Sequence, residues 1–362
     1  MAQPSPLPDR LQSIAHARSL VLQDRTPAPV TGLPSWITQS WQRCLDMGLQ
    51  PGQAIGFDAV SAQHIQHVQE ASRPLVQAAQ PVLLELARAI ADIRYFAILT
   101  NAEGIVVDVH GAIDRQDRRA DAIARIGVDL SERSVGTTAI SAALREQQPV
   151  WLHRGEHFFK DTSIYSCAGA PVFGPDGQCA GMLDLTGIET VERPALKHLV
   201  RRSARSIENS WLLSCAHALT LRLNWPGNQP GDDSDGLLTL DAEGRILGAN
   251  PTARQMLSLE VGMPAHASDV FATPWESLFD AAHHQAAAQE IPLWSGLRLL
   301  AQAMVPGRRT VHASAHASSG PLRDVQSAMI RDAVRQAKGN VAEAARLLGI
   351  SRATVYRKLG AR

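Results

Sequence analysis

The stretch Ala168-Gly-Ala-Pro-Val-Phe-Gly-Pro-Asp-Gly-Gln-Cys-Ala-Gly-Met-Leu-Asp-Leu185 decides the fold of the larger part of this chain. Its two apolar runs flank Gly-Pro-Asp-Gly, which is a turn sequence, so the stretch predicts an antiparallel β-hairpin. Upstream, the β-rich runs 95–100 and 105–109 flank Asn-Ala-Glu-Gly in the same way. Two hairpins in one region predict an antiparallel sheet.

Helical segments lie between and after these hairpins. Residues 132–144 predict a loop that leads into a helix, and residues 148–152 predict a single strand. The order hairpin, helix, strand, hairpin, helix is typical of an antiparallel sheet with helices on one side. The fold class that we predict is therefore α+β.

Two helices that flank this region have heptad spacing. The first, over 81–93, and a second run that closes the region space their apolar side chains by three and four residues. The positions are Ala79, Leu83, Leu86, Ile90 and Ile93, and then Leu196, Val200, Ser203, Ile207 and Ser210 or Trp211. This spacing suits two helices that pair across a dimer, and a helix that faces its own core explains it equally well.

A second, smaller unit follows a linker. Gly236–Leu240, Asp-Ala-Glu-Gly and Arg245–Ala249 predict another hairpin, and Asn250-Pro251 caps and begins a helix. Stretches rich in Pro, Gly, Asn and Ser indicate linkers on both sides of this unit.

Composition places the chain among globular proteins. It has 362 residues, 45% of them hydrophobic, and 35 basic against 35 acidic side chains. No window has the length and apolar character of a membrane span, and the first ten residues lack the pattern of a signal peptide, so we expect a cytoplasmic protein. Cys44, Cys167, Cys179 and Cys215 form no Cys-x-x-Cys pair, which favours reduced thiols. The sequence indicates no cofactor.

The C-terminal segment predicts a helix-turn-helix. In Asn340–Leu359, Asn340 caps a first helix, Gly349 ends it, and Ser351 caps a second. From residue 321 onward nine Lys or Arg face three Asp or Glu, although the whole chain is neutral. Positive charge on one small module indicates binding to double-stranded DNA. The residues that we expect to contact DNA are Ser351, Arg352, Ala353, Thr354, Tyr356, Arg357 and Lys358.

Several of these stretches resemble regulators of the acetoin and glycerol catabolism type. Ser134–Ile140, Gly155–Phe158 and Cys167–Gly187 are similar to motifs of their GAF sensor domain, with Thr138 where Asn is usual and Ser141 for a frequent Gly. Ser-Trp-Gln-Arg-Cys44 with Gly-Leu49 resembles their N-terminal opening. The second unit resembles the start of a PAS domain, and the C-terminal segment resembles the Fis-type DNA-binding domain.

The resemblance implies a particular domain organisation. We expect a helical region over 1–75, a GAF-type antiparallel sheet with helices over 76–215, linkers over 216–234 and 301–320, a reduced PAS-like α+β module over 235–300, and an all-α Fis-type helix-turn-helix over 321–362. Relatives of this type also carry an ATP-driven AAA+ module. The chain contains no Gly-x-x-x-x-Gly-Lys-Ser/Thr motif.

We therefore expect a ligand-responsive transcription regulator that acts as a homodimer without ATP hydrolysis. Its expected partners are double-stranded DNA, a small-molecule effector in the GAF domain and RNA polymerase, and no membrane. We expect the effector to contact Thr137, His157, Cys167 and Asp184.

Three alternatives remain open at the level of sequence. An interaction protein could form mixed dimers with longer relatives, and an enzyme could use the GAF-like pocket, with Cys167 as nucleophile. A metal could be held by His153, His157, Cys167 and Cys179, although their spacing matches no zinc motif. We expect no metal and no catalytic residue.

Overall fold

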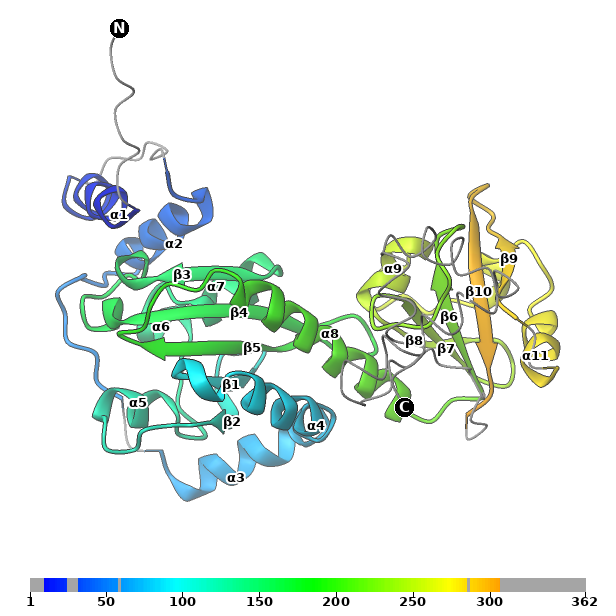
Figure 1. The fold of residues 1–362 in the computed structure, drawn as a ribbon, viewed down its shortest axis with the longest axis horizontal. Coiled ribbons are helices and arrows are strands. Elements are labelled where there is room, and N and C mark those ends of the chain that lie inside the picture. The colour runs from blue at the N-terminus through cyan, green and yellow to red at the C-terminus, as the bar shows by residue number, and fades with distance from the viewer. Residues whose placement is uncertain (1–9, 25–31, 58–59, 285–286, 307–362) are drawn as a thin grey trace, which may run out of the picture. The chain divides into compact units, whose positions relative to one another are not determined.

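The computed structural model describes residues 10–24, 32–57, 60–284 and 287–306 and shows two antiparallel sheets with helices around them (Figure 1). This confirms the predicted α+β class. The chain divides into two units, 1–307 and 308–362. The predicted helix-turn-helix belongs to the second unit and lies outside the described residues.

The first sheet contains both predicted hairpins. Its strands are β1 (Tyr95–Asn101), β2 (Val106–Gly111), β3 (Val150–His153), β4 (Tyr165–Phe173) and β5 (Cys179–Ile188), in the order β2-β1-β5-β4-β3. In the β4–β5 hairpin, Gly169 lies opposite Asp184 and Ala168 opposite Leu185. The register sends Asp184 to the same face as Ile98, its partner on β1.

Helices cover both faces of this sheet. The helices and helical turns of this part are α3 (Ala62–Ala71), α4 (Arg73–Ala89), η2 (Ala91–Ile93), α5 (Arg118–Ile123), α6 (Glu132–Val135), α7 (Ala139–Glu146), η3 (Arg154–Glu156), η4 (Asp161–Ile164) and α8 (Leu196–Ser214). Ala97 and Leu99 pack under α4 and α8, whereas Phe96 and Ile98 pack under α5 to α7. The expectation of helices on one side was wrong, because β1 is apolar at successive positions and buries both faces.

The heptad positions of α4 and α8 are used within the chain. Leu83, Leu86, Val200 and Ile207 all belong to the core on the first sheet face. The structure thus shows the core-facing alternative, and these side chains are not available to a second copy. Helix α4 also begins at Arg73, earlier than predicted, and runs through Pro81.

N-terminal helices pack on the edge of this part. They are α1 (Arg10–Arg18), the π-helical turn η1 (Ser19–Gln23) and α2 (Ser35–Asp46). Trp41 and Cys44 of α2 share a core with Phe158 and Phe159. This end of the chain is therefore held by side chains of the first sheet's connecting loops.

The second sheet includes a strand that the sequence prediction placed in a linker. Its elements are β6 (Leu219–Asn224), β7 (Gly236–Leu240), β8 (Ile246–Ala249), α9 (Pro251–Leu257), α10 (Ala267–Val270), α11 (Glu276–His283), β9 (Gln289–Pro292) and β10 (Arg298–Met304). The strand order is β8-β7-β6-β10-β9, so β6 is central. Leu219, Leu221 and Leu223 are fully buried and alternate with polar residues, which is why this part of the expected linker 216–234 forms a strand.

The two sheets have one topology in permuted form. Numbered along the chain within each sheet, the first order is 2-1-5-4-3 and the second is 3-2-1-5-4. Counting β6 as the last strand of its sheet converts the second order into the first, with every neighbouring pair antiparallel. The predicted PAS-like module is thus not reduced in its sheet. None of the helices that the structure describes has the length and apolar character of a membrane span.

Candidate functional site

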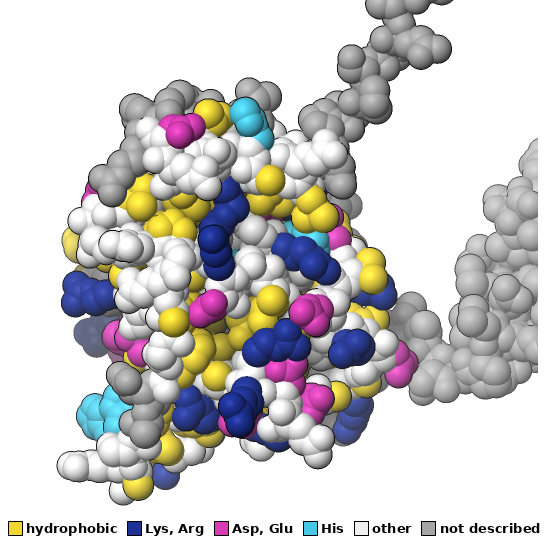
Figure 2. Space-filling view, turned by 90° about the vertical axis from the view of Figure 1, so that its left-hand side faces the viewer, with side chains coloured by type: hydrophobic (Ala, Val, Ile, Leu, Met, Phe, Trp, Pro, Cys, Tyr) yellow, Lys and Arg dark blue, Asp and Glu magenta, His cyan; other side chains and the backbone are white. Residues whose placement is uncertain are grey.

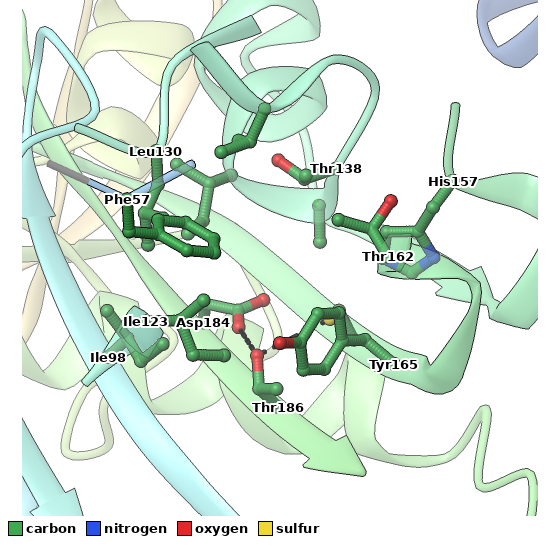
Figure 3. A pocket seen from close by; sticks show the side chains of 14 residues that line it. Phe57, Ile98, Ile123, Leu130, Thr138, His157, Thr162, Tyr165, Asp184 and Thr186 are labelled. Atoms are coloured by element: carbon green, nitrogen blue, oxygen red, sulfur yellow. Dashed lines mark hydrogen bonds between the residues drawn. The ribbon is translucent and has the colours of Figure 1, made fainter. Parts of the chain in front are cut away.

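A small cavity lies between the first sheet and the segments that pack on its α5–α7 face (Figure 3). Its lining residues are Phe57, Ile98, Ile123, Leu130, Val135, Thr138, Ala139, Ile140, His157, Thr162, Tyr165, Cys167, Asp184 and Thr186. The space open to the centre of a water molecule is about 30 Å³. This suits one or two waters or a molecule of a few heavy atoms, and is too small for a nucleotide or a flavin.

The N-terminus of α7 forms one wall of the cavity. Thr138 accepts a hydrogen bond from the Ser141 amide at 3.2 Å, and the Ser141 hydroxyl accepts one from the Thr138 amide at 3.0 Å. This is a capping box, and it begins the helix at Ala139. The two departures from the GAF motif, Thr138 and Ser141, therefore act together as the cap that shapes this wall.

Asp184 is the polar group at the centre of the cavity (Figure 3). It is fully buried; Thr186 donates a hydrogen bond to its Oδ2, and Oδ1 has no partner among the described residues. Burial raises the pKa of this carboxyl to about 7, against a smaller lowering by Thr186. When the carboxyl is neutral, the proton belongs on Oδ1, because Oδ2 already accepts from Thr186. Asp184 can then donate to a ligand oxygen.

His157 supplies the second unpartnered polar atom. Its Nδ1 lies 2.9 Å from the Arg154 carbonyl oxygen, which can only accept, so Nδ1 carries the proton. Burial lowers the pKa of His157 to about 4, which keeps the imidazole neutral. Nε2 is therefore a buried acceptor with no partner among the described residues. It can accept a hydrogen bond from a ligand hydroxyl.

Cys167 lines the cavity as an unreactive thiol. It is buried, its Sγ lies 3.4 Å from the Thr186 hydroxyl, and burial raises its pKa well above the ordinary value. A thiol of this kind is a poor nucleophile. His153 Nδ1 lies 2.8 Å from the Ser166 hydroxyl, and no cluster of metal-binding side chains occurs among the residues that the structure describes.

Thr137 does not line the cavity, although the sequence analysis predicted it as an effector contact. Its hydroxyl lies 2.7 Å from that of Ser40 and 3.6 Å from the Cys44 sulfur, so it faces α2. Its neighbour Thr138 lines the cavity instead. Gly136, with φ of 65°, turns the chain just before this pair. His157, Cys167 and Asp184 are brought together as predicted, and whether they bind an effector stays a prediction.

Sequence reasoning missed Phe57, which lies at the border of three hollows. Its side chain lines the cavity and also two open depressions, one beside His64 and Asp129 and one beside Arg118 and Lys160. In Figure 3 its ring lies at the end of the cavity away from His157. No local pattern marks Phe57, because it belongs to an irregular segment that packs on the sheet only in the folded chain.

The structure does not place the residues that we predicted to contact DNA. All seven, from Ser351 to Lys358, lie outside the described residues. Their role stays a prediction from the sequence.

Comparison with known proteins finds two families in the chain. Residues 15–209 match the family described as "MimR, N-terminal domain", and residues 321–361 match "Bacterial regulatory protein, Fis family". The second match agrees with the predicted Fis-type segment over 321–362. The first covers the N-terminal helices and the first sheet together.

Individual relatives are similar over part of their length. The acetoin catabolism regulatory protein of Cupriavidus necator is 30% identical over 256 residues, which are 68% of this chain and 37% of that protein. The propane 2-monooxygenase operon transcriptional activator MimR of Mycolicibacterium goodii is 30% identical over 196 residues, 53% of this chain and 32% of that protein. The chain thus spans about a third of the length of the curated relatives it matches.

Among solved structures, this chain is similar to one chain of the E. coli DhaR(N)–DhaL complex. The TM-score is 0.46, the sequence identity is 14%, and the match covers 75% of this chain and 99% of that one. The stronger finding is the family match, since residues 15–209 are more than half of the 362 residues. Together with the similarity to the acetoin catabolism regulatory protein, it confirms the resemblance to acetoin-type regulators that the sequence motifs indicated. The chain belongs to the family defined by the MimR N-terminal domain, with a C-terminal segment of the Fis family.

Proposed function

We propose that this protein is a transcription regulator that binds double-stranded DNA through residues 321–362 and responds to a small neutral molecule held in the cavity. One observation carries the proposal: a cavity lined by two buried polar atoms that have no hydrogen-bond partner among the described residues occurs in the same chain as a Fis-family segment. A buried polar group without a partner costs about 1–3 kcal/mol, which a ligand that pairs with it would recover. Burial makes the Cys167 thiol a poor nucleophile, which counts against the alternative of an enzyme that uses it.

The cavity chemistry defines the class of effector. His157 Nε2 accepts a hydrogen bond from a hydroxyl, and protonated Asp184 donates one to a carbonyl or hydroxyl oxygen. Apolar side chains fill most of the remaining wall. A hydroxy ketone or a small secondary alcohol meets these demands. Acetoin, which appears in the name of one relative, belongs to this class. So does 2-propanol, the alcohol expected from a propane 2-monooxygenase.

Charge supports the C-terminal segment as the DNA-binding part. On the face of the described region shown in Figure 2, Lys and Arg are interspersed with Asp and Glu. From residue 321 onward, nine basic side chains face three acidic ones. Binding to DNA phosphates requires such a local excess. We further propose that the protein acts as a homodimer in the cytoplasm, contacts RNA polymerase, and regulates without hydrolysing ATP.

Calorimetric titration tests the effector. Acetoin and 2-propanol should bind the full chain, whereas lactate, of similar size but anionic, should not, because the described residues that line the cavity include a carboxyl and neither Lys nor Arg. His157→Phe should abolish binding while circular dichroism is unchanged. Equal binding by wild type and His157→Phe, or binding of lactate alone, would overturn the assigned site.

A separate assay tests DNA binding. Genomic fragments selected by the full chain should bind with an affinity that falls steeply as salt rises, and Arg357→Ala should weaken this binding. Gel filtration should show a dimer. Affinity that is indifferent to salt, or DNA occupancy that needs a longer relative, would favour the interaction-protein alternative.

A further inference from the structure

Helix α2 carries a short run of residues, four of which contact the loops that form the cavity. The run is Ser40-Trp-Gln-Arg-Cys44, the stretch that resembles the N-terminal opening of acetoin-type regulators. We define the first cavity loop as residues 132–138 and the second cavity loop as residues 154–162. The first supplies Val135 and Thr138 to the cavity, and the second supplies His157 and Thr162.

Arg43 and Ser40 hold the first cavity loop. Arg43 donates two hydrogen bonds to the Glu132 carboxylate, at 3.0 and 2.8 Å, which is a bidentate ion pair. Ser40 donates to the same carboxylate and lies 2.7 Å from the Thr137 hydroxyl. Both ends of this loop are therefore fixed to one helix.

Trp41 and Arg18 hold the second cavity loop. The Trp41 indole donates to the Glu156 carbonyl at 2.9 Å. Arg18 of α1 donates to the carbonyls of Gly155 at 2.7 Å and of Phe158 at 2.8 Å, and also to that of His157. Its guanidinium lies 5.5 Å from the centre of the Trp41 ring, within the range of a cation–π contact. The backbone that carries His157 is thus bonded from α1 on both sides.

The two cavity loops also contact each other directly. The Phe158 amide donates to the Thr137 carbonyl at 3.3 Å. At Gly136 an added Cβ would lie only 2.9 Å from Cβ of Phe158, so only a glycine lets the loops approach this closely. A displacement of one loop must therefore move the other.

We infer that Arg18, Ser40, Trp41 and Arg43 are positioning residues of the cavity, which hold Thr138 and His157 where a ligand can meet them. The N-terminal helices and the cavity are then coupled. Loss of the α2 contacts makes the cavity loops more mobile, and binding of a ligand in the cavity makes α2 less mobile. The positioning role needs no ligand, and only the second half of this coupling rests on the proposed function.

Hydrogen–deuterium exchange of the full chain tests the positioning role. Arg43→Gln removes the ion pair to Glu132 and should raise exchange in residues 133–140 about tenfold, as expected for losing partly buried charged hydrogen bonds. The double variant Arg43→Glu with Glu132→Arg restores an ion pair and should return exchange most of the way to wild type. The control Arg298→Gln, which breaks the Arg298–Glu290 pair in the second sheet, should leave residues 133–140 unchanged.

A conservative variant addresses the second cavity loop. Trp41→Phe keeps an aromatic ring and loses the hydrogen bond to Glu156, so exchange in 157–162 should rise several-fold. Nuclear magnetic resonance of ¹⁵N-labelled histidine should also show the pKa of His157 moving from about 4 toward its ordinary value as water reaches the ring. If α2 exchanges faster in these variants while both loops and His157 keep wild-type behaviour, the inference is overturned.

Acetoin as a probe tests the coupling from the other side. Saturating acetoin should slow exchange in residues 35–46, although α2 lines no part of the cavity. Bound acetoin without any effect on α2 would refute the coupling and leave the effector site intact. Failure of acetoin to bind, together with normal loop loosening in Arg43→Gln, would refute the proposed effector class and leave the positioning role standing.

Discussion

Replacing Asp184 by Asn should change how the stability of the protein depends on pH. Asp184 is fully buried and its pKa is raised from 3.8 to about 7, so the folded chain keeps a proton that the unfolded chain has already lost. The stabilising contribution of the neutral carboxyl is complete below pH 3.8 and is lost as the pH rises to about 7. Asparagine has no such proton, so this part of the pH dependence should vanish.

The size of the effect follows from the two pKa values. Each pH unit over which the folded state holds the extra proton changes the free energy of unfolding by about 1.4 kcal/mol. Between pH 5 and pH 8, Asp184 should therefore destabilise the wild type by roughly 3 kcal/mol relative to Asp184→Asn. The amide leaves its own buried groups unpaired, which shifts the variant by a similar amount at both pH values. The difference between the two pH values is thus the quantity that matters.

Urea unfolding at pH 5 and pH 8, followed by circular dichroism, measures this difference. Asp92→Asn, at an exposed acid in η2, is the matched control and should show the wild-type pH dependence. Other buried groups, such as Glu208, contribute equally to all three proteins and cancel. Parallel pH profiles for wild type and Asp184→Asn would show that the carboxyl ionises without penalty, and would refute the reasoning on the cavity.

Four further substitutions test other parts of the structure. Phe57→Ala should join the cavity to both open depressions, so that hydroxy ketones longer than acetoin bind more tightly in calorimetry. Asn250→Ala removes four side-chain hydrogen bonds at the start of α9 and should destabilise the second sheet by about 2–4 kcal/mol in thermal unfolding. Gly181→Ala places a Cβ only 2.0 Å from the Thr100 carbonyl oxygen and should prevent β1–β5 pairing, seen as loss of folded protein. Arg357→Ala should weaken DNA binding by about 1–3 kcal/mol in a gel-shift titration if it contacts a base, with the fold unchanged.

Local sequence patterns predicted the hairpins. The rest of the fold depends on pairing between distant segments, which local patterns do not predict. The β4–β5 hairpin was predicted because its turn residues and its apolar runs are adjacent in the sequence. Strand β6 was not predicted, although Leu219, Leu221 and Leu223 alternate with polar residues, because the Pro- and Gly-rich segment that follows favours one continuous linker over both. Its neighbour β10 begins at Arg298, far from β6 in the sequence, so no local pattern predicts that these two strands pair. The heptad positions of α4 and α8 do face a partner surface, but spacing alone does not indicate whether that surface belongs to the same chain.

The sequence predicted most residues of the candidate site, but it did not predict which side chains face the cavity. Motif resemblance placed His157, Cys167 and Asp184 near one another, and all three line the cavity. The resemblance predicted Thr137, whereas Thr138 lines the cavity. The turn at Gly136 determines which of these two adjacent hydroxyls faces the cavity, and this turn packs against Phe158. The tautomer of His157 depends on a carbonyl that η3 brings to it.

The electrostatics of the cavity support the proposal that its effector is neutral. Asp184 and His157 are both buried, and burial moves their pKa values in opposite directions, to about 7 for the acid and about 4 for the base. If they formed an ion pair, the acid would titrate lower and the base higher. Near neutral pH His157 is uncharged and Asp184 is at least partly so, and each keeps one hydrogen-bonding atom unused among the described residues. An anion would meet a carboxyl without a cation to balance it, and a cation would have to leave water for a mostly apolar wall. A small molecule with one hydroxyl and one carbonyl would satisfy both atoms and bring no charge into the cavity.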